Sequence, residues 1–153
     1  MRRLVLLFAV VAAALLVAGG TALAATLACN GGRCVGGDGP DTMYGSKEKD
    51  QIHGRKGGDF VRGDRANDLI NGDGGDDKLL GGRGDDRVYG SGGGDVVAGK
   101  GGNDRLGGGS SSDRIEAADG MRDVISCGRG PRDLVVFDAG LDRLTDCEIR
   151  RPR

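Results

Sequence analysis

The sequence predicts an all-β fold, a parallel β-roll (β-solenoid) of nine nonapeptide repeats with a disulfide-pinned C-terminal cap. Three observations predict it: glycine supplies 32 of 153 residues, tryptophan is absent, and three residue columns recur every nine positions. Glycine is about three times commoner than in an average protein. The scarcity of aromatic residues excludes a core of large rings. The net charge of −1 is unlike the strongly charged, apolar-poor composition of a disordered chain.

The repeat begins at Gly36 and runs through nine units to residue 116. Position 1 is always glycine, position 6 always aspartate and position 8 always a medium-sized apolar residue. The apolar column consists of Met43, Ile52, Val61, Ile70, Leu79, Val88, Val97, Leu106 and Ile115. The complete pattern GGxGxDxUx, with U apolar, stands in units 36–44 and 81–89. A glycine period of nine rather than three excludes collagen.

One apolar residue in nine cannot form the stripe of an amphipathic helix. It predicts a three-residue strand at positions 7–9, with residue 8 pointing inward, and a turn made by the other six residues. Glycine suits such a turn because it adopts positive φ readily. Two units make one coil of 18 residues, and coils stack about 4.8 Å apart. Nine units therefore predict four and a half coils, roughly 20 Å long, around a thin core.

Stacking aligns the position-6 aspartates in two ladders. One ladder holds Asp41, Asp59, Asp77, Asp95 and Asp113, and the other holds Asp50, Asp68, Asp86 and Asp104. Carboxylates about 5 Å apart repel by about 1 kcal/mol per pair in water, which predicts a divalent cation between successive turns. Calcium accepts irregular cages of carboxylate and carbonyl oxygens. Zinc is disfavoured because the turns carry no histidine or thiolate.

Glycines at positions 2 and 4 would let backbone carbonyls face the ion. The candidates are Gly37, Gly39, Gly57, Gly75, Gly82, Gly84, Gly93 and Gly102. Units 2 and 4 lack the position-4 glycine and carry cations in the turn, so we expect weaker sites at Asp50 and Asp68. The best sites are expected between units 1 and 3, 3 and 5, 5 and 7, and 6 and 8. A roll that keeps its shape but has lost some ions remains an alternative.

The repeat resembles the RTX nonapeptide family of secreted calcium-binding proteins. The resemblance covers residues 36–116. It implies that calcium lies between adjacent turns, held by aspartate carboxylates and turn carbonyls, and that binding is coupled to folding. In larger members such repeats accompany a protease or lipase domain. We expect this chain to be non-enzymatic, because the leader, repeats and cap leave no room for such a domain.

The predicted leader is a secretory signal peptide at residues 1–24. Arg2 and Arg3 precede an apolar run over residues 4–17, and residues 22–24 fit a small-x-small cleavage site. A membrane anchor is the alternative, although the run is short for a span of about 20 residues. Cleavage would leave a secreted, extracellular, mildly acidic chain with no membrane span.

The remaining segments are an N-terminal linker or cap at 25–35, the calcium-binding roll at 36–116, and degenerate repeats with a C-terminal cap at 117–153. The last segment repeats Asp-x-apolar at Asp123, Asp133 and Asp142, and a capped end protects the exposed strand edges of a solenoid.

Four cysteines follow the leader, and an even number in an exported chain favours disulfides. Of three possible connectivities we expect Cys29–Cys34 and Cys127–Cys147, because the two pairs flank the middle of the chain. The spacing and an oxidising compartment disfavour a four-thiolate metal site. A lipidated Cys29 is a minor alternative, since residues 26–28 make a poor lipobox.

The mild charge gives no reason to expect nucleic acid as a partner, and we expect a monomer that binds calcium ions. The Arg-Gly-Asp tripeptides at 62–64 and 83–85 are attributed to chance, and His53 to an outward surface position. The alternative function is a non-enzymatic cell-surface or matrix protein with calcium structural or partly lost and an unidentified cell-envelope partner. Its exposed basic residues are Arg55, Lys56, Arg62, Arg65, Arg83 and Arg87.

Overall fold

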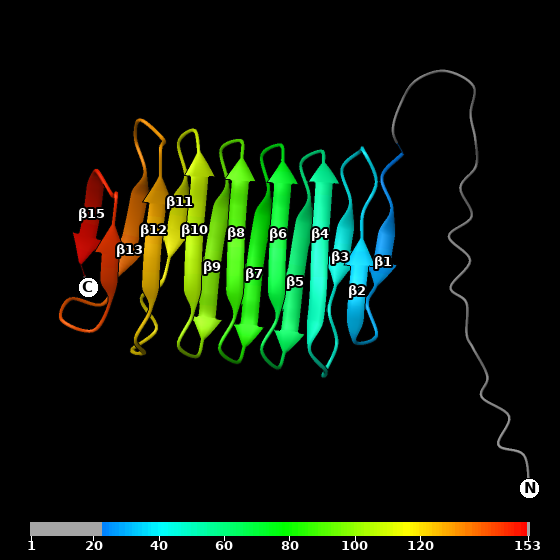
Figure 1. Cartoon of the computed structure of the whole chain (residues 1–153), viewed down its shortest axis with the longest axis horizontal. Helices are drawn as coiled ribbons and strands as arrows, with labels where there is room; N and C mark the ends of the chain where they lie inside the picture. Colours follow the sequence, from blue (N-terminus) through cyan, green and yellow to red (C-terminus); the bar gives the residue numbers. More distant parts are fainter. Residues whose placement is uncertain (1–22, 153) are drawn as a thin grey trace, which may run out of the picture.

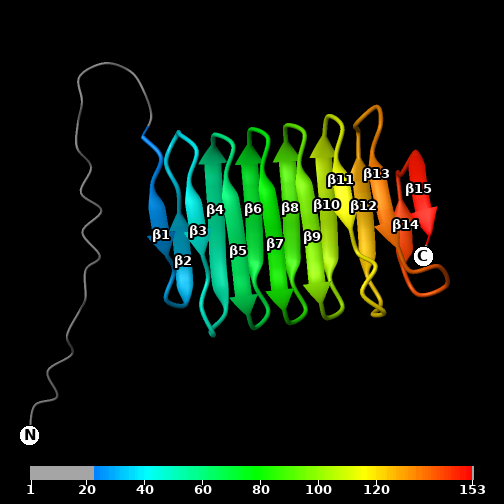
Figure 2. The same ribbon diagram turned by 180° about the vertical axis from the view of Figure 1, so that it is seen from behind.

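A single column of apolar side chains, held between two parallel β-sheets, forms the core of the molecule. The computed structural model describes residues 23–152, so the predicted leader lies almost wholly outside the described residues. The chain winds through about seven coils, and each coil contributes one strand to each sheet. Figures 1 and 2 show the two sheets facing each other along the whole roll.

The sheets divide the strands by their order in the chain. The 8-stranded sheet contains β1 (Thr26–Ala28), β3 (Thr42–Tyr44), β5 (Phe60–Arg65), β7 (Lys78–Arg83), β9 (Val96–Gly101), β11 (Arg114–Glu116), β13 (Leu134–Phe137) and β15 (Ile149–Pro152). The 7-stranded sheet contains β2 (Gly32–Val35), β4 (Asp50–Lys56), β6 (Leu69–Gly74), β8 (Arg87–Gly92), β10 (Arg105–Ser110), β12 (Val124–Gly128) and β14 (Arg143–Thr145). The predicted parallel β-roll is confirmed.

The position-8 residues form the core as predicted: each is at most 2% exposed. They stack in register from coil to coil, as Ile52 does on Ile70 and Leu79 on Val97. Full burial of one such side chain stabilises a fold by about 1.5–3 kcal/mol. Because each coil offers only two of these residues, the coils are stable only when stacked.

The roll extends beyond the nine exact repeats at both ends. Ile125 and Val135 continue the buried column after unit 9. At the other end, the segment expected as a linker forms β1 and β2, where Leu27 pairs with Met43 and Cys34 with Ile52. The degenerate Asp-x-apolar units therefore mark real coils, and another coil precedes Gly36.

The predicted strand length is wrong for the central coils. Strands β5 to β10 each have six residues rather than three, running from position 7 to position 3 of the next unit. Pairing resumes after the position-1 glycine, as in the partners Asp64↔Gly82 and Arg65↔Arg83. The turn is therefore confined to positions 4–6 in these coils.

The reason for the invariant glycine column also differs from the expectation. None of the position-1 glycines has positive φ. Instead, a Cβ on Gly36 would lie 2.6 Å from both Asp41 Oδ2 and the carbonyl oxygen of Gly54. Position 1 is thus glycine because two backbones and a carboxylate approach each other closely there. Positive φ occurs at positions 2 and 4, for example at Asp64 and Gly57.

Both predicted disulfides are present, Cys29–Cys34 near the N-terminal end and Cys127–Cys147 near the C-terminal end. Their Cα atoms lie 5.7 Å and 5.0 Å apart, ordinary distances for a disulfide. With all four cysteines paired, the structure supports neither a thiolate metal site nor a lipidated Cys29. Among the residues described, no helix is long and apolar enough to cross a membrane.

Candidate metal centre

The position-6 aspartates form two buried ladders along the roll, each residue at most 2% exposed. The backbone N–H of each aspartate donates a hydrogen bond to Oδ1 of the aspartate one coil further on. These bonds are 2.7 Å from Asp41 to Asp59 and 2.8 Å from Asp68 to Asp86. One carboxylate oxygen of each residue is therefore satisfied by the fold itself.

In most ladder residues the second carboxylate oxygen has no such partner. Asp41 differs, because its two oxygens accept the N–H groups of Ala25 and Gly37. Ten buried carboxylate oxygens among the described residues lack any hydrogen bond: Oδ1 of Asp50 and Oδ2 of Asp59, Asp68, Asp77, Asp86, Asp95, Asp104, Asp113, Asp123 and Asp133. A buried polar atom without a partner costs about 1–3 kcal/mol, and more when charged. Two regular rows of such oxygens fit hard cations.

Burial raises the pKa of most of these carboxyl groups, because it removes water from the charged form. The backbone N–H from the preceding coil opposes the rise, and neighbouring carboxylates add to it. The pKa is raised to about 7 for Asp77, Asp86 and Asp123, and to about 6 for Asp68, Asp95, Asp104 and Asp113. The pKa of Asp59 is raised too. Burial is therefore a larger cost than the mutual repulsion of the carboxylates that the spacing in the sequence predicts.

Backbone carbonyls at positions 2 and 4 also lie close to the neighbouring coil. A Cβ on Gly57 would lie 2.6 Å from the carbonyl oxygen of Gly39, and one on Gly82 would lie 2.5 Å from that of Asp64. Carboxylate and carbonyl oxygens are the ligands that calcium prefers. The described turns offer no histidine or thiolate between the ladders, so the donor set fits calcium and disfavours zinc.

The structure brings the predicted aspartates together as two ladders, but the predicted glycines behave in two ways. Those with positive φ are Gly57, Gly75, Gly82, Gly84, Gly93 and Gly102. Gly37 and Gly39 do not have positive φ, and the N–H of Gly37 donates to Asp41 Oδ2 at 2.5 Å. The first unit therefore forms a different turn, although its consensus is complete.

Sequence reasoning missed three aspartates that join the ladders. Asp123 and Asp133 continue the hydrogen-bonded rows, accepting the N–H of Asp104 and Asp113 at 2.8 Å and 2.9 Å. Asp142 then accepts the N–H of Asp123. Their signal was the recurring Asp-x-apolar pattern, which was assigned only to a cap. Intervals of 19 and 20 residues instead of 18 hide the continuation.

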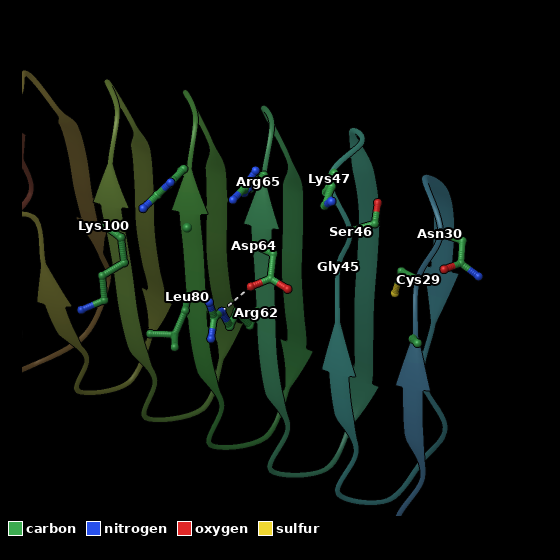
Figure 3. Close-up of a pocket in the computed structure, with 13 residues that line it drawn as sticks. Cys29, Asn30, Gly45, Ser46, Lys47, Arg62, Asp64, Arg65, Leu80 and Lys100 are labelled. Carbon is green, nitrogen blue, oxygen red and sulfur yellow. Dashed lines mark ion pairs between the residues drawn. The ribbon is translucent and has the colours of Figure 1, made fainter.

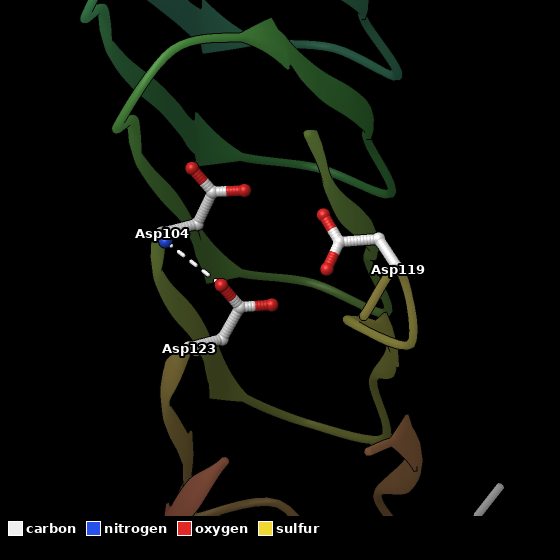
Figure 4. Close-up of side chains that lie close together, drawn as sticks. All are labelled: Asp104, Asp119 and Asp123. Atoms are coloured by element: carbon white, nitrogen blue, oxygen red, sulfur yellow. Dashed lines mark hydrogen bonds between the residues drawn. The ribbon is translucent and has the colours of Figure 1, made fainter. Parts of the chain in front are cut away.

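A fourth missed residue, Asp119, lies in the loop between β11 and β12. Carboxylate oxygens of Asp104, Asp119 and Asp123 all lie within 4.8 Å of one another (Figure 4). Asp104 and Asp123 are buried and each has an unpartnered Oδ2, whereas Asp119 is exposed. This group offers three carboxylates for one cation. No sequence signal marked Asp119, because it stands outside the repeat register.

Comparison with known families agrees with this geometry. The family model described as the RTX calcium-binding nonapeptide repeat matches residues 35–70, 53–88 and 89–120, which together span more than half of the chain. No curated protein and no solved structure matches the chain significantly. The repeat columns, the parallel roll and the family match lead to one conclusion: the chain belongs to the RTX calcium-binding nonapeptide repeat family.

Proposed function

We propose that this is a secreted, non-enzymatic protein whose β-roll folds around calcium ions bound between successive coils. The observation that carries the proposal is the double row of buried carboxylate oxygens without partners. In the odd-numbered units Asp59, Asp77, Asp95 and Asp113 would hold the ions, and in the even-numbered units Asp86 and Asp104 would. Carbonyl oxygens of the turns would complete each site. Bound calcium supplies the positive charge that lets these carboxylates ionise inside the roll.

Export would bring the chain to a compartment where calcium is abundant. Extracellular calcium modules bind at about 0.1–1 mM, a range that the cytosol does not reach. Two disulfides agree with an oxidising compartment. The leader at residues 1–24 would direct export, and 36–116 with its flanking coils would then fold outside the cell. Calcium binding would thus couple folding to location.

Calcium titration of the mature chain tests this function. Without calcium at neutral pH, circular dichroism is expected to show little β-structure, and added calcium is expected to restore it. Magnesium at the same concentration is expected to be far less effective, because it keeps its water ligands and demands octahedral geometry. A chain equally folded in chelator, or folded equally well by magnesium, would contradict the proposal.

The two ladders are expected to bind calcium unequally. Asp50 Oδ2 already accepts hydrogen bonds from the N–H and hydroxyl of Ser46, and the positive charge of Lys49 acts on Asp68. Position 4 of unit 4 is Ala66, held at a positive φ of 72°. Asp59 and Asp68 both have an unpartnered Oδ2, so the contrast lies in the turn, where position 4 beside Asp59 is Gly57. The site between Asp50 and Asp68 is therefore expected to be weak or empty.

Isothermal titration of Asp59→Asn and Asp68→Asn would measure the difference. Each substitution removes one charge and keeps an oxygen that can accept the N–H of the preceding coil. Asp59→Asn is expected to remove more bound calcium than Asp68→Asn. Equal losses would show that the ladders are equivalent.

The alternative function, a cell-surface interaction protein, gains support from one surface only. The structure places Arg62, Arg65 and Arg83 together on strands β5 and β7 of the 8-stranded sheet. Arg55, Lys56 and Arg87 lie on the other sheet. The six basic residues therefore do not form one surface.

A further inference from the structure

A basic groove crosses the outer surface of the 8-stranded sheet, away from the buried aspartate ladders. It has a volume of about 820 Å³ and extends over five neighbouring strands, from the end of β1 to β9. Figure 3 shows its side chains along successive coils. Its charged residues are five cations, Lys47, Arg62, Arg65, Arg83 and Lys100, and one acid, Asp64.

Three of these cations occupy one column of the repeat. Lys47, Arg65 and Arg83 are 18 residues apart at position 3, and Arg65 and Arg83 are direct partners across β5 and β7. Lys100 extends the charged row onto β9, where it pairs in register with Gly82. Like charges on neighbouring strands, about 4.8 Å apart, are destabilising unless something neutralises them.

The described part of the chain neutralises little of this charge. Arg62 Nε forms an ion pair with Asp64 Oδ1 at 2.5 Å, which uses the only acid of the groove. No ion pair within the described residues involves Lys47, Arg65, Arg83 or Lys100. All four residues are exposed. The groove therefore presents a row of unpaired positive charges with the spacing of the coils.

The shape of the groove restricts what can lie in it. Its volume over four strand-to-strand steps of about 4.8 Å gives a mean cross-section of roughly 40 Å². This suits one extended polymer chain and is too narrow for a nucleic-acid duplex. The lining has no aromatic side chain on which the bases of a single strand could stack.

We propose that this groove binds a linear anionic polysaccharide with one carboxylate on each sugar, lying along the axis of the roll. The rise of one sugar in an extended chain is similar to the spacing between coils, so the carboxylates of the polymer and the cations of the groove would have a similar density along the axis. Arg65 and Arg83 would each donate two parallel hydrogen bonds to a carboxylate. Lys47 and Lys100 would hold the polymer at either end, and Leu80 would contact a sugar face.

Calorimetric binding of oligogalacturonate tests the proposal. The mature, calcium-saturated protein is titrated with oligomers too short to form a gel with calcium. The double variant Arg65→Gln/Arg83→Gln is expected to bind at least about tenfold more weakly. The matched control is Arg87→Gln/Arg105→Gln, which removes two exposed arginines that are partners in the same way on the 7-stranded sheet. The control is expected to change the affinity by less than about twofold.

Further measurements distinguish binding of this polymer from binding of other anions. Methyl-esterified oligogalacturonate has the same chain without the charges and is expected not to bind, and added salt is expected to weaken binding of the charged oligomer. Circular dichroism verifies that each variant is folded. Absent binding, equal losses in the two double variants, or tighter binding to single-stranded DNA or anionic vesicles would each overturn the proposal.

Discussion

In calcium-free solution the free energy of unfolding is expected to fall as the pH rises from about 4 to about 8. Seven ladder aspartates have a pKa raised to about 6 or about 7 in the folded chain, from an ordinary value of 3.8. Below the ordinary value both states are protonated, and the full stability is present. Between the two values the folded state holds protons that the unfolded state has released, so stability is lost as the pH rises through 6 to 7.

The pKa of Asp77 shows how large this loss of stability is. A rise of about three pH units in the pKa of Asp77 corresponds to about 4 kcal/mol. The whole stability of a domain is about 5–15 kcal/mol. Ionising the ladders at neutral pH without cations is therefore expected to cost a large part of the stability of the fold. Protons at acidic pH and calcium at neutral pH are two ways to remove the same cost.

Urea unfolding at several pH values between 4.5 and 7.5, followed by circular dichroism, measures this dependence. Asp77→Asn removes one titrating group and is expected to flatten the pH dependence. The control Asp38→Asn alters an exposed carboxylate whose charge acts on none of these seven groups, and it is expected to leave the pH dependence unchanged. With saturating calcium the trend is expected to reverse, because protons compete with the ion below about pH 6. Stability in chelator that stays constant or rises with pH would contradict the argument.

The period of nine was enough to predict the roll, its core column and both aspartate ladders. These features depend only on which residues recur, and Met43 to Ile115 are buried as their positions require. The six-residue strands could not be predicted, because positions 2 and 3 vary from Arg55-Lys56 to Asp64-Arg65. Their extended conformation is set by pairing with the neighbouring coil, which no single unit specifies.

The physical origin of the ladder's cost was also beyond the sequence. The spacing of Asp59 and Asp77 revealed their mutual repulsion, but only the fold shows that water is excluded from both. The basic groove could be predicted from the sequence only in part. Its row of Lys47, Arg65 and Arg83 follows from the 18-residue coil, yet the volume in front of it depends on neighbouring backbone and side chains. Sequence periodicity thus predicts which residues align, and the structure adds what surrounds them.

Replacing Gly81 with alanine is expected to destabilise the calcium-loaded roll by about 3 kcal/mol. The new Cβ would lie 2.5 Å from Asp86 Oδ2 and 2.7 Å from the carbonyl oxygen of Gly99. Both contacts are far inside van der Waals distance, and one of the two partners is backbone that the next coil holds in place. The substitution would also push aside an oxygen that we propose as a calcium ligand, so calcium affinity is expected to fall with stability.

Gly101→Ala is the matched control for this substitution. Gly101 also lacks a positive φ, but its Cβ would meet only the carbonyl oxygen of Gly82, at an ordinary 3.9 Å. Alanine there is expected to change the unfolding free energy by less than about 1 kcal/mol, since it loses no backbone conformation that only glycine adopts. Urea unfolding of both variants in calcium measures the contrast. Similar small effects at both positions would mean that the coils can move apart at position 1, and close approach would then not explain why that column is always glycine.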